Sequence, residues 1–184
     1  MHKIGVLYNP LSEASVQLSN EVSDWLRLRG CTVWRGVSAG ARGDPPMSDD
    51  LELLVALGGD GTVLRAARLA IEHGGVPVLP VALGHLNFMA DIGPERIYEG
   101  LELLIDGGGW HDERTLLDAT VSHGNHGSEP DQHFLALNEI LVARGEINRV
   151  LQVDVALYDA HVTTYHADGV VIASATGSTA YAMA

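Results

Sequence analysis

A short polar loop follows the most apolar run of the sequence, and its residue types are those that phosphate chemistry uses. Leu53–Leu57 is entirely apolar, Gly58–Thr62 has the sequence GGDGT, and apolar residues at helical spacing continue toward Gly74-Gly75. The pattern predicts a strand covered on both faces, a tight turn, and a helix with Thr62 as its N-cap. Glycines at a helix N-terminus let a phosphate approach free backbone N–H groups. The loop is therefore a candidate phosphate site.

Asp60 is the residue in this loop that a simple phosphate site does not need. A carboxylate repels phosphate unless it holds a metal ion or accepts a proton or hydrogen bond from a hydroxyl. A kinase that phosphorylates an alcohol needs such a group. The GxxxxGK[ST] pattern fails because it lacks a lysine, and GxGxxG fails because Leu64 replaces its last glycine. For GGDG alone, a structural turn with a capping aspartate stays open as the alternative.

Composition and charge limit the classes of partner. The chain has 184 residues, 46% of them apolar, and a formal net charge of −13, with Lys3 as its only lysine. This charge disfavours nucleic acid and anionic membranes as partners. No apolar stretch approaches the roughly 20 residues that span a bilayer, so we predict a cytoplasmic protein. Cys31 is the only cysteine, which excludes a disulfide framework and favours a buried thiol in a strand.

The pattern of apolar residues predicts an α/β part followed by a β-rich part. The first part alternates strand-like and helical segments, as in a parallel sheet with right-handed crossovers. Its strands are expected at 3–8, 31–35, 53–57 and 76–83, and its helices at 16–28, about 62–73 and 94–105. Strand-like runs without helices follow at 115–121, 134–143, 150–158, 161–166 and 170–174. We therefore predict an α/β domain at 1–109, carrying the glycine loop, and an antiparallel domain at 110–184.

Three histidines lie close together in the segment Ser122–His133. By number alone, His123, His126 and His133 suggest a metal site, but glycine, asparagine, serine and proline surround them. That composition is typical of a hairpin loop, and the histidines lack a fixed scaffold. We therefore predict a loop and assign no metal ligand.

A second group of polar residues follows apolar strands in the β-rich part. Asn138 and Glu139 end the run that begins at Phe134, where an amide and a carboxylate need polar partners. Asp168 precedes another apolar strand, which leads into Ser174–Tyr181, SATGSTAY. Hydroxyls, small residues and one aromatic ring suit a nucleoside pocket.

Three motifs in this order, GGDGT at 58–62, NE at 138–139 and TGSTAY at 176–181 preceded by Asp168-Gly169, resemble the NAD kinase family. GGDGT alone is shared with diacylglycerol and sphingosine kinases, and a variant with phosphofructokinases, whereas TGSTAY is more particular to NAD kinases. The resemblance implies an α/β N-terminal domain with a parallel sheet, similar to phosphofructokinases and diacylglycerol kinases. An all-β C-terminal sandwich domain would follow, with NAD held between the domains near the glycine loop.

The resemblance also implies a reaction. The terminal phosphate of ATP, or alternatively of polyphosphate, would be transferred to the 2′-hydroxyl of the adenosine ribose of NAD. Asp60 would be the general base, and the glycine loop with a divalent cation, Mg²⁺, would handle the donor phosphates. The family is usually oligomeric, so a homo-oligomer is expected, with no nucleic acid or membrane partner.

Individual residues take roles by similarity to the family. Gly61 and Arg65 would line the loop, Asn138 and Glu139 would hydrogen-bond NAD, and Asp168 would contact its nicotinamide half. Phe88 is an expected adenine-side contact, whereas Arg149 and His166 lie outside the strictest motifs. The last implied contacts, which would close the pocket, are Thr179, Ala180, Tyr181, Ala182, Met183 and Ala184.

The chain departs from the family pattern in three places. The family segment NxGxLGF appears here as 82–88, ALGHLNF, without its Asn and second Gly, and TPTGSTAY appears as SATGSTAY. The family continues beyond TAY into a GGP turn and further strands, so we expect a truncated chain with an incomplete β domain and little activity alone. Two alternatives remain: a GGDGT-type lipid or sphingoid kinase, and a non-catalytic NAD-binding fragment.

Overall fold

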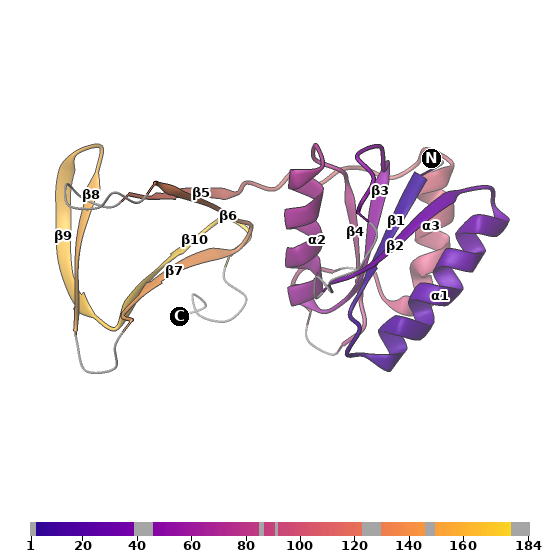
Figure 1. The fold of residues 1–184 in the computed structure, drawn as a ribbon, viewed down its shortest axis with the longest axis horizontal. Coiled ribbons are helices and arrows are strands. Elements are labelled where there is room, and N and C mark those ends of the chain that lie inside the picture. The colour runs from indigo at the N-terminus through magenta and orange to yellow at the C-terminus, as the bar shows by residue number, and fades with distance from the viewer. Residues whose placement is uncertain are drawn as a thin grey trace. The chain divides into compact units, whose positions relative to one another are not determined.

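A computed structural model describes residues 3–38, 46–84, 87–90, 92–122, 130–145 and 150–177. The contacts divide the chain into two compact units, Met1–Glu113 (unit 1) and Arg114–Ala184 (unit 2). Unit 1 combines helices with a parallel sheet, and unit 2 consists of strands in its described residues (Figure 1). The predicted succession of an α/β part and a β-rich part is confirmed.

Unit 1 contains a four-stranded parallel sheet with the strand order β2-β1-β3-β4. The strands are β1 (Lys3–Tyr8), β2 (Thr32–Val37), β3 (Leu53–Gly58) and β4 (Val78–Ala82). The helices are α1 (Glu13–Leu28), α2 (Asp60–Glu72) and α3 (Ile97–Ile105), the last preceded by a 3₁₀ turn at Pro94–Arg96. None of the described helices is long and apolar enough to cross a membrane.

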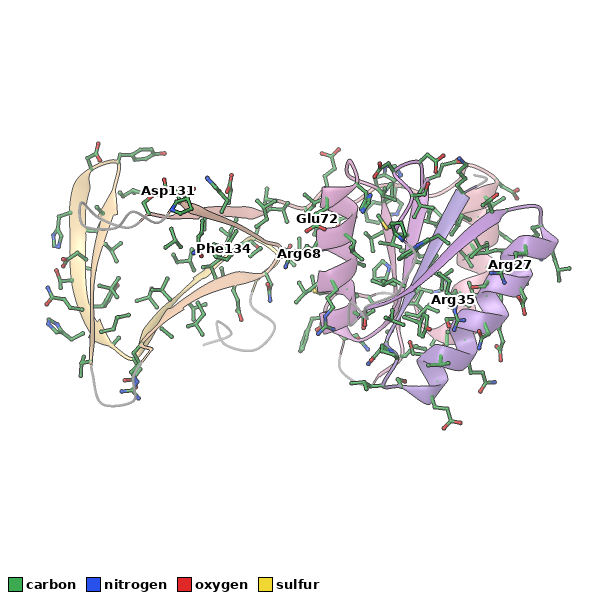
Figure 2. All side chains as sticks on the ribbon, viewed as in Figure 1. Arg27, Arg35, Arg68, Glu72, Asp131 and Phe134 are labelled. Carbon is green, nitrogen blue, oxygen red and sulfur yellow. The ribbon has the colours of Figure 1, made fainter. Side chains whose placement is uncertain are left out.

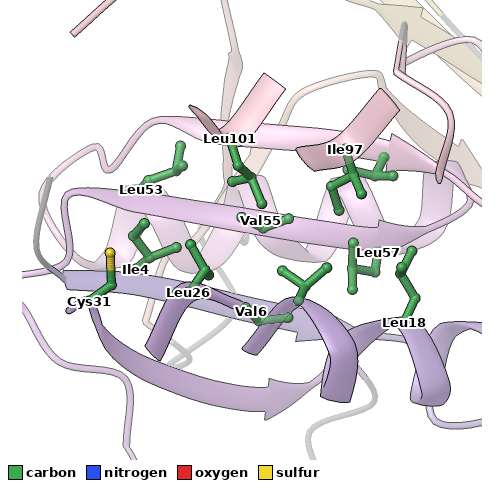
Figure 3. Close-up of a cluster of buried hydrophobic side chains, with 12 residues drawn as sticks. Ile4, Val6, Leu18, Leu26, Cys31, Leu53, Val55, Leu57, Ile97 and Leu101 are labelled. Carbon is green, nitrogen blue, oxygen red and sulfur yellow. The ribbon is translucent and has the colours of Figure 1, made fainter. Parts of the chain in front are cut away.

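Strand β3 is the centre of unit 1, and all six of its residues are buried. Successive side chains point to opposite faces of the sheet. Leu53, Val55 and Leu57 join the cluster formed with α1 and α3, which Figure 3 shows with Leu26 and Leu101. On the opposite face, Leu54 and Ala56 pack with α2. Burial on both faces explains the unbroken apolar run, and the packed layers fix the point where β3 ends.

The glycine loop leaves the sheet where the topology changes direction. From the central pair β1 and β3, the chain extends to β2 on one side and to β4 on the other, with α1 and α2 on opposite faces (Figure 1). In open α/β sheets, ligands bind at the carboxyl ends of the strands beside such a switch point. The position of the loop therefore fits a ligand site independently of its sequence.

The described strands of unit 2 form three antiparallel pairs, β5–β6, β7–β10 and β8–β9. They are β5 (Leu117–Val121), β6 (Gln132–Ala136), β7 (Glu139–Ala143), β8 (Leu151–Leu157), β9 (Ala160–Ala167) and β10 (Gly169–Ala173). The prediction of one run over 134–143 is wrong, because the structure divides it at Leu137 and Asn138 into strands of different sheets. Asn138 thus lies between two strands, so its backbone groups are available for hydrogen bonds outside the two strand pairs.

Amide hydrogen exchange should differ sharply between the two units. No described residue of unit 2 is buried, and Phe134, labelled on β6 in Figure 2, is 49% exposed. Because two-stranded sheets without a covered apolar face are marginally stable, we expect fast exchange in β5–β10 and strong protection in β1 and β3. Mass-spectrometric exchange on the 184-residue chain measures this directly. Equal protection of β7 and β3 would contradict it.

Candidate functional site

Helix α2 begins at the glycine loop, three residues earlier than predicted. Gly59 is the N-cap and Asp60 the first helical residue, so the prediction of Thr62 as N-cap is wrong. The Gly59 carbonyl accepts hydrogen bonds from the N–H groups of Thr62 (2.8 Å) and Val63 (3.3 Å). The Thr62 side chain instead packs inward, 3% exposed, against the position where Gly58 has no Cβ. The glycines therefore lie at a helix N-terminus, as a phosphate site requires.

The Asp60 carboxylate is held by backbone N–H groups from the loop that follows β4. Its Oδ1 accepts from Phe88 (3.1 Å) and Met89 (3.2 Å), and its Oδ2 lies 3.3 Å from the Phe88 nitrogen. These residues meet because β3 and β4 are parallel neighbours, with Gly58 opposite Ala82. A carboxylate has about four lone-pair positions, so Asp60 keeps the capacity to accept a hydrogen bond from a hydroxyl.

The other predicted residues of unit 1 lie around the same loop. Gly61 is exposed in the first turn of α2, and Arg65 lies one turn later with its Nη1 3.4 Å from the Gly61 carbonyl oxygen. The Phe88 side chain is 59% exposed, whereas its backbone contacts Asp60. The fold thus brings together a carboxylate, a guanidinium, an exposed aromatic ring and a helix N-terminus.

In unit 2, hydrogen bonds join the NE motif to Ser174, the first residue of the SATGSTAY segment. The Ser174 N–H donates to the Asn138 carbonyl at 2.7 Å, and its hydroxyl donates to the Leu137 carbonyl. Glu139 is opposite Ala173 in the β7–β10 pair, and its Oε2 is buried without a hydrogen-bond partner among the described residues. A buried carboxylate oxygen is costly unless a donor reaches it. This end of the pair is therefore a candidate acceptor of ligand hydroxyl or amide groups.

Asp168 does not lie with the NE motif. It precedes β10 at the opposite end of the β7–β10 pair, and its carboxylate contacts the Arg144 guanidinium at 2.9 Å. Four residues of strand separate the two ends, which is about 14 Å at the usual rise. His166 is exposed on β9, opposite Gln152 of β8. A ligand that contacts both Glu139 and Asp168 must therefore be elongated.

Several predicted residues lie outside the described part of the chain. They are Arg149, Thr179, Ala180, Tyr181, Ala182, Met183 and Ala184, together with His123 and His126 of the histidine segment. His133 is described, and its ring nitrogen Nδ1 lies 3.1 Å from the Thr120 hydroxyl. Among the described residues, no three His, Cys, Asp or Glu side chains are grouped as a metal site.

Comparison with known proteins identifies the family. The model of the ATP-NAD kinase N-terminal domain matches residues 41–109, and that of the ATP-NAD kinase C-terminal domain matches residues 137–184. The chain belongs to the NAD kinase family. The glycine loop and Asp60 fall in the first matched region, and the NE motif in the second, so both groups of polar residues lie within NAD kinase domains.

Relatives and solved structures agree with this family. An NAD kinase of Chloroflexus aggregans is 55% identical over 184 residues, all of this chain but 65% of the relative. Yeast NADH kinase in complex with NADH has a TM-score of 0.82 at 24% identity, covering 100% of this chain and 60% of that one. An NAD kinase from Archaeoglobus fulgidus in complex with ATP has a TM-score of 0.66 at 19% identity, covering 93% and 60%. The chain thus has the fold of NAD kinases over less than two thirds of the length of the relatives.

Sequence reasoning missed two residues of the candidate site. The side-chain amide of Asn87 lies between Gly59 of the glycine loop and Gly84, and Arg144 pairs with Asp168. The signal for Asn87 was its departure from the family glycine. Arg144 follows an apolar strand that pairs with the strand after Asp168, but only knowledge of the antiparallel register connects the two residues.

Proposed function

We propose that the protein transfers the terminal phosphate of ATP to the 2′-hydroxyl of the adenosine ribose of NAD, forming NADP. The observation that carries this proposal is the Asp60 carboxylate, held by two backbone N–H groups at a glycine-rich helix N-terminus. A carboxylate beside bound phosphates is repulsive unless it meets a hydroxyl or a metal ion, so its presence here favours an alcohol acceptor. Membership of the NAD kinase family supports the identity of the acceptor.

In the proposed reaction, the glycine loop and Asp60 have separate tasks. The free N–H groups and the positive end of the α2 dipole receive donor phosphates. Arg65, which projects back toward Gly61, adds a positive charge on the same side. The Asp60 carboxylate accepts the proton of the ribose hydroxyl as its oxygen attacks the terminal phosphorus, and the bond from that phosphorus to ADP breaks.

A divalent cation, which we propose to be Mg²⁺, would bind with the donor phosphates at this loop. Mg²⁺ is usually held by one or two carboxylates together with substrate phosphates, not by a cage of protein groups. The described residues contain no acidic cluster that would hold the ion alone, so the donor phosphates would supply much of its coordination. When bound, the ion neutralises charge that develops on the donor phosphates.

We assign Asn138 and Glu139 to the acceptor, because they belong to unit 2 and not to the phosphate loop. The unpartnered Oε2 of Glu139 needs a donor, which a hydroxyl or amide of NAD would supply. The proposed contacts of Phe88 with the adenine side and of Asp168 with the nicotinamide half suit an elongated ligand. His166, Arg149 and residues 179–184 remain proposed contacts by similarity.

Alanine at either residue of the NE motif should weaken NAD binding while leaving ATP unaffected. Losing one hydrogen bond to a charged group lowers affinity by roughly tenfold or more, so Glu139→Ala should raise the dissociation constant for NAD by about that factor. Calorimetric titration with NAD measures it, and Asp118→Ala, an exposed carboxylate on β5, is the control. An unchanged NAD affinity with a raised Michaelis constant for ATP would refute the assignment.

Two rival functions are separated by a thermal-shift panel of NAD, NADP, ATP and a sphingoid base. An NAD kinase is stabilised by NAD and ATP, and a sphingoid kinase by the sphingoid base and ATP. A non-catalytic NAD-binding module responds to NAD but incorporates no phosphate into it. Stabilisation by the sphingoid base and not by NAD would overturn the proposal.

We also propose that the protein is a cytoplasmic homo-oligomer that uses ATP or polyphosphate as phosphate donor. Sedimentation would test the oligomeric state, and a series of donors would test the donor range.

A further inference from the structure

Asn87 connects the two loops at the carboxyl edge of the sheet in unit 1. Its Nδ2 donates to the Gly84 carbonyl at 2.8 Å, after β4. Its Oδ1 faces the glycine loop after β3, where a Cβ added to Gly59 would lie 3.7 Å away. The amide thus fills the space between two glycines, neither of which has a side chain to make this contact.

The orientation of this amide follows from its two surroundings. The reverse orientation would place Oδ1 against the Gly84 carbonyl, oxygen facing oxygen, whereas the observed one satisfies that carbonyl. Oδ1 is buried and has no hydrogen-bond partner among the described residues. An unpaired buried acceptor such as Oδ1 is unfavourable and does not stabilise the side chain. The hydrogen bond from Nδ2 to the Gly84 carbonyl is therefore the interaction that keeps Asn87 in place.

The backbone that Asn87 anchors is the backbone that holds Asp60. Phe88 and Met89 follow it directly, and their N–H groups are the donors to Asp60 Oδ1. Within the family segment NxGxLGF, Asn87 stands at the second glycine. A glycine there has no side chain with which to fix the following N–H groups, whereas the Asn87 amide ties them to Gly84.

We propose that Asn87 is a positioning residue for Asp60. Its side-chain amide anchors the loop after β4 so that the N–H groups of Phe88 and Met89 hold the Asp60 carboxylate at the glycine loop. The catalytic meaning of this contact rests on the proposed function, because Asp60 is the general base only if the acceptor is a hydroxyl. The contact itself does not depend on the identity of the substrate.

Nuclear magnetic resonance tests the contact without any turnover. In the unaltered protein, the hydrogen bonds to Asp60 should protect the amides of Phe88 and Met89 from exchange, and Asp60→Ala, which removes the acceptor, should speed their exchange. Asn87→Ala should speed exchange of both amides by about five- to tenfold. Gln17→Ala, which removes an exposed amide paired with Glu21 on α1, should leave both amides unchanged.

A second variant tests the donor end of the amide. Asn87→Asp keeps the size of the side chain but removes the Nδ2 donor to the Gly84 carbonyl. Exchange of the Phe88 and Met89 amides should therefore speed up as it does in Asn87→Ala. Unchanged exchange of both amides in the two variants would overturn the proposal.

Kinetics separate this proposal from the proposed function. With NAD as acceptor, Asn87→Ala should lower kcat by about tenfold with little change in KM for NAD, because the base is misplaced while the acceptor contacts remain. If the amides respond as expected but NAD is not phosphorylated, the proposed function fails and the positioning role stands.

Discussion

Replacing Asp60 by asparagine should lower the turnover of NAD phosphorylation by roughly 10²- to 10⁴-fold, while NAD affinity changes far less. An asparagine Oδ1 can still accept the hydrogen bonds that Phe88 and Met89 donate to Asp60. The substitution therefore removes the proton acceptor and keeps the loop. Initial rates and calorimetric titration on the same preparation measure the two quantities.

The matched control for this variant is Asp24→Asn. Asp24 lies on α1, where its exposed carboxylate pairs with Arg27, so the same chemical change is made far from the glycine loop in sequence. Turnover in the control should equal that of the unaltered protein. Near-normal turnover in Asp60→Asn would rule out Asp60 as the general base.

Replacing Gly58 by alanine should damage both stability and phosphate transfer. The added Cβ would lie 2.4 Å from the Thr62 Oγ1 and 2.8 Å from the Thr62 Cβ. Rotation of the threonine side chain relieves the first contact but not the second, because the Cβ position is fixed by the backbone. Since Thr62 is buried, the start of α2 must move, at a cost of about 1–3 kcal/mol.

Displacement of the α2 N-terminus should also lower the rate of phosphate transfer. A shift of up to about 1 Å should reduce that rate by roughly tenfold or more. Gly61→Ala is the control for stability, because a Cβ at Gly61 meets only the end of the Arg65 side chain, at 3.8 Å. Thermal unfolding should show a lowered midpoint for Gly58→Ala, whereas the midpoint of Gly61→Ala should not be lowered. Equal midpoints would mean that Gly58 is not required by packing.

Local sequence patterns predicted the elements of unit 1 because its sheet is buried on both faces. The apolar run of β3 reflects its contacts with α1 and α3 on one face and α2 on the other. The start of α2 was mispredicted because the rule for threonine caps is local. Asp60 instead takes the first helical position and bonds to Phe88 and Met89, 28 and 29 residues away, which no local pattern reveals.

In the candidate site, the residue types were predictable but their grouping was only partly so. The positions of Gly61 and Arg65 beside Asp60 follow from a glycine loop at the end of a parallel strand, whereas the contact of Asp60 with Phe88 depends on the pairing of β3 with β4. The separation of Asp168 from Glu139 depends on the antiparallel register of β7 and β10, which spacing along the chain does not determine. Asn87 was visible only as a departure from the family pattern.

The central claim is most directly tested by incorporation of phosphate into NAD. The chain, extended by the C-terminal strands that the family pattern carries beyond TAY, is incubated with Mg²⁺, NAD and ATP labelled at its terminal phosphate, and the labelled product is isolated and assayed with an NADP-specific dehydrogenase. We predict NAD-dependent incorporation into a product that this dehydrogenase reduces, lowered by roughly 10²- to 10⁴-fold in Asp60→Asn. Stabilisation by NAD with no incorporation, or label appearing only in a lipid acceptor, would contradict the account.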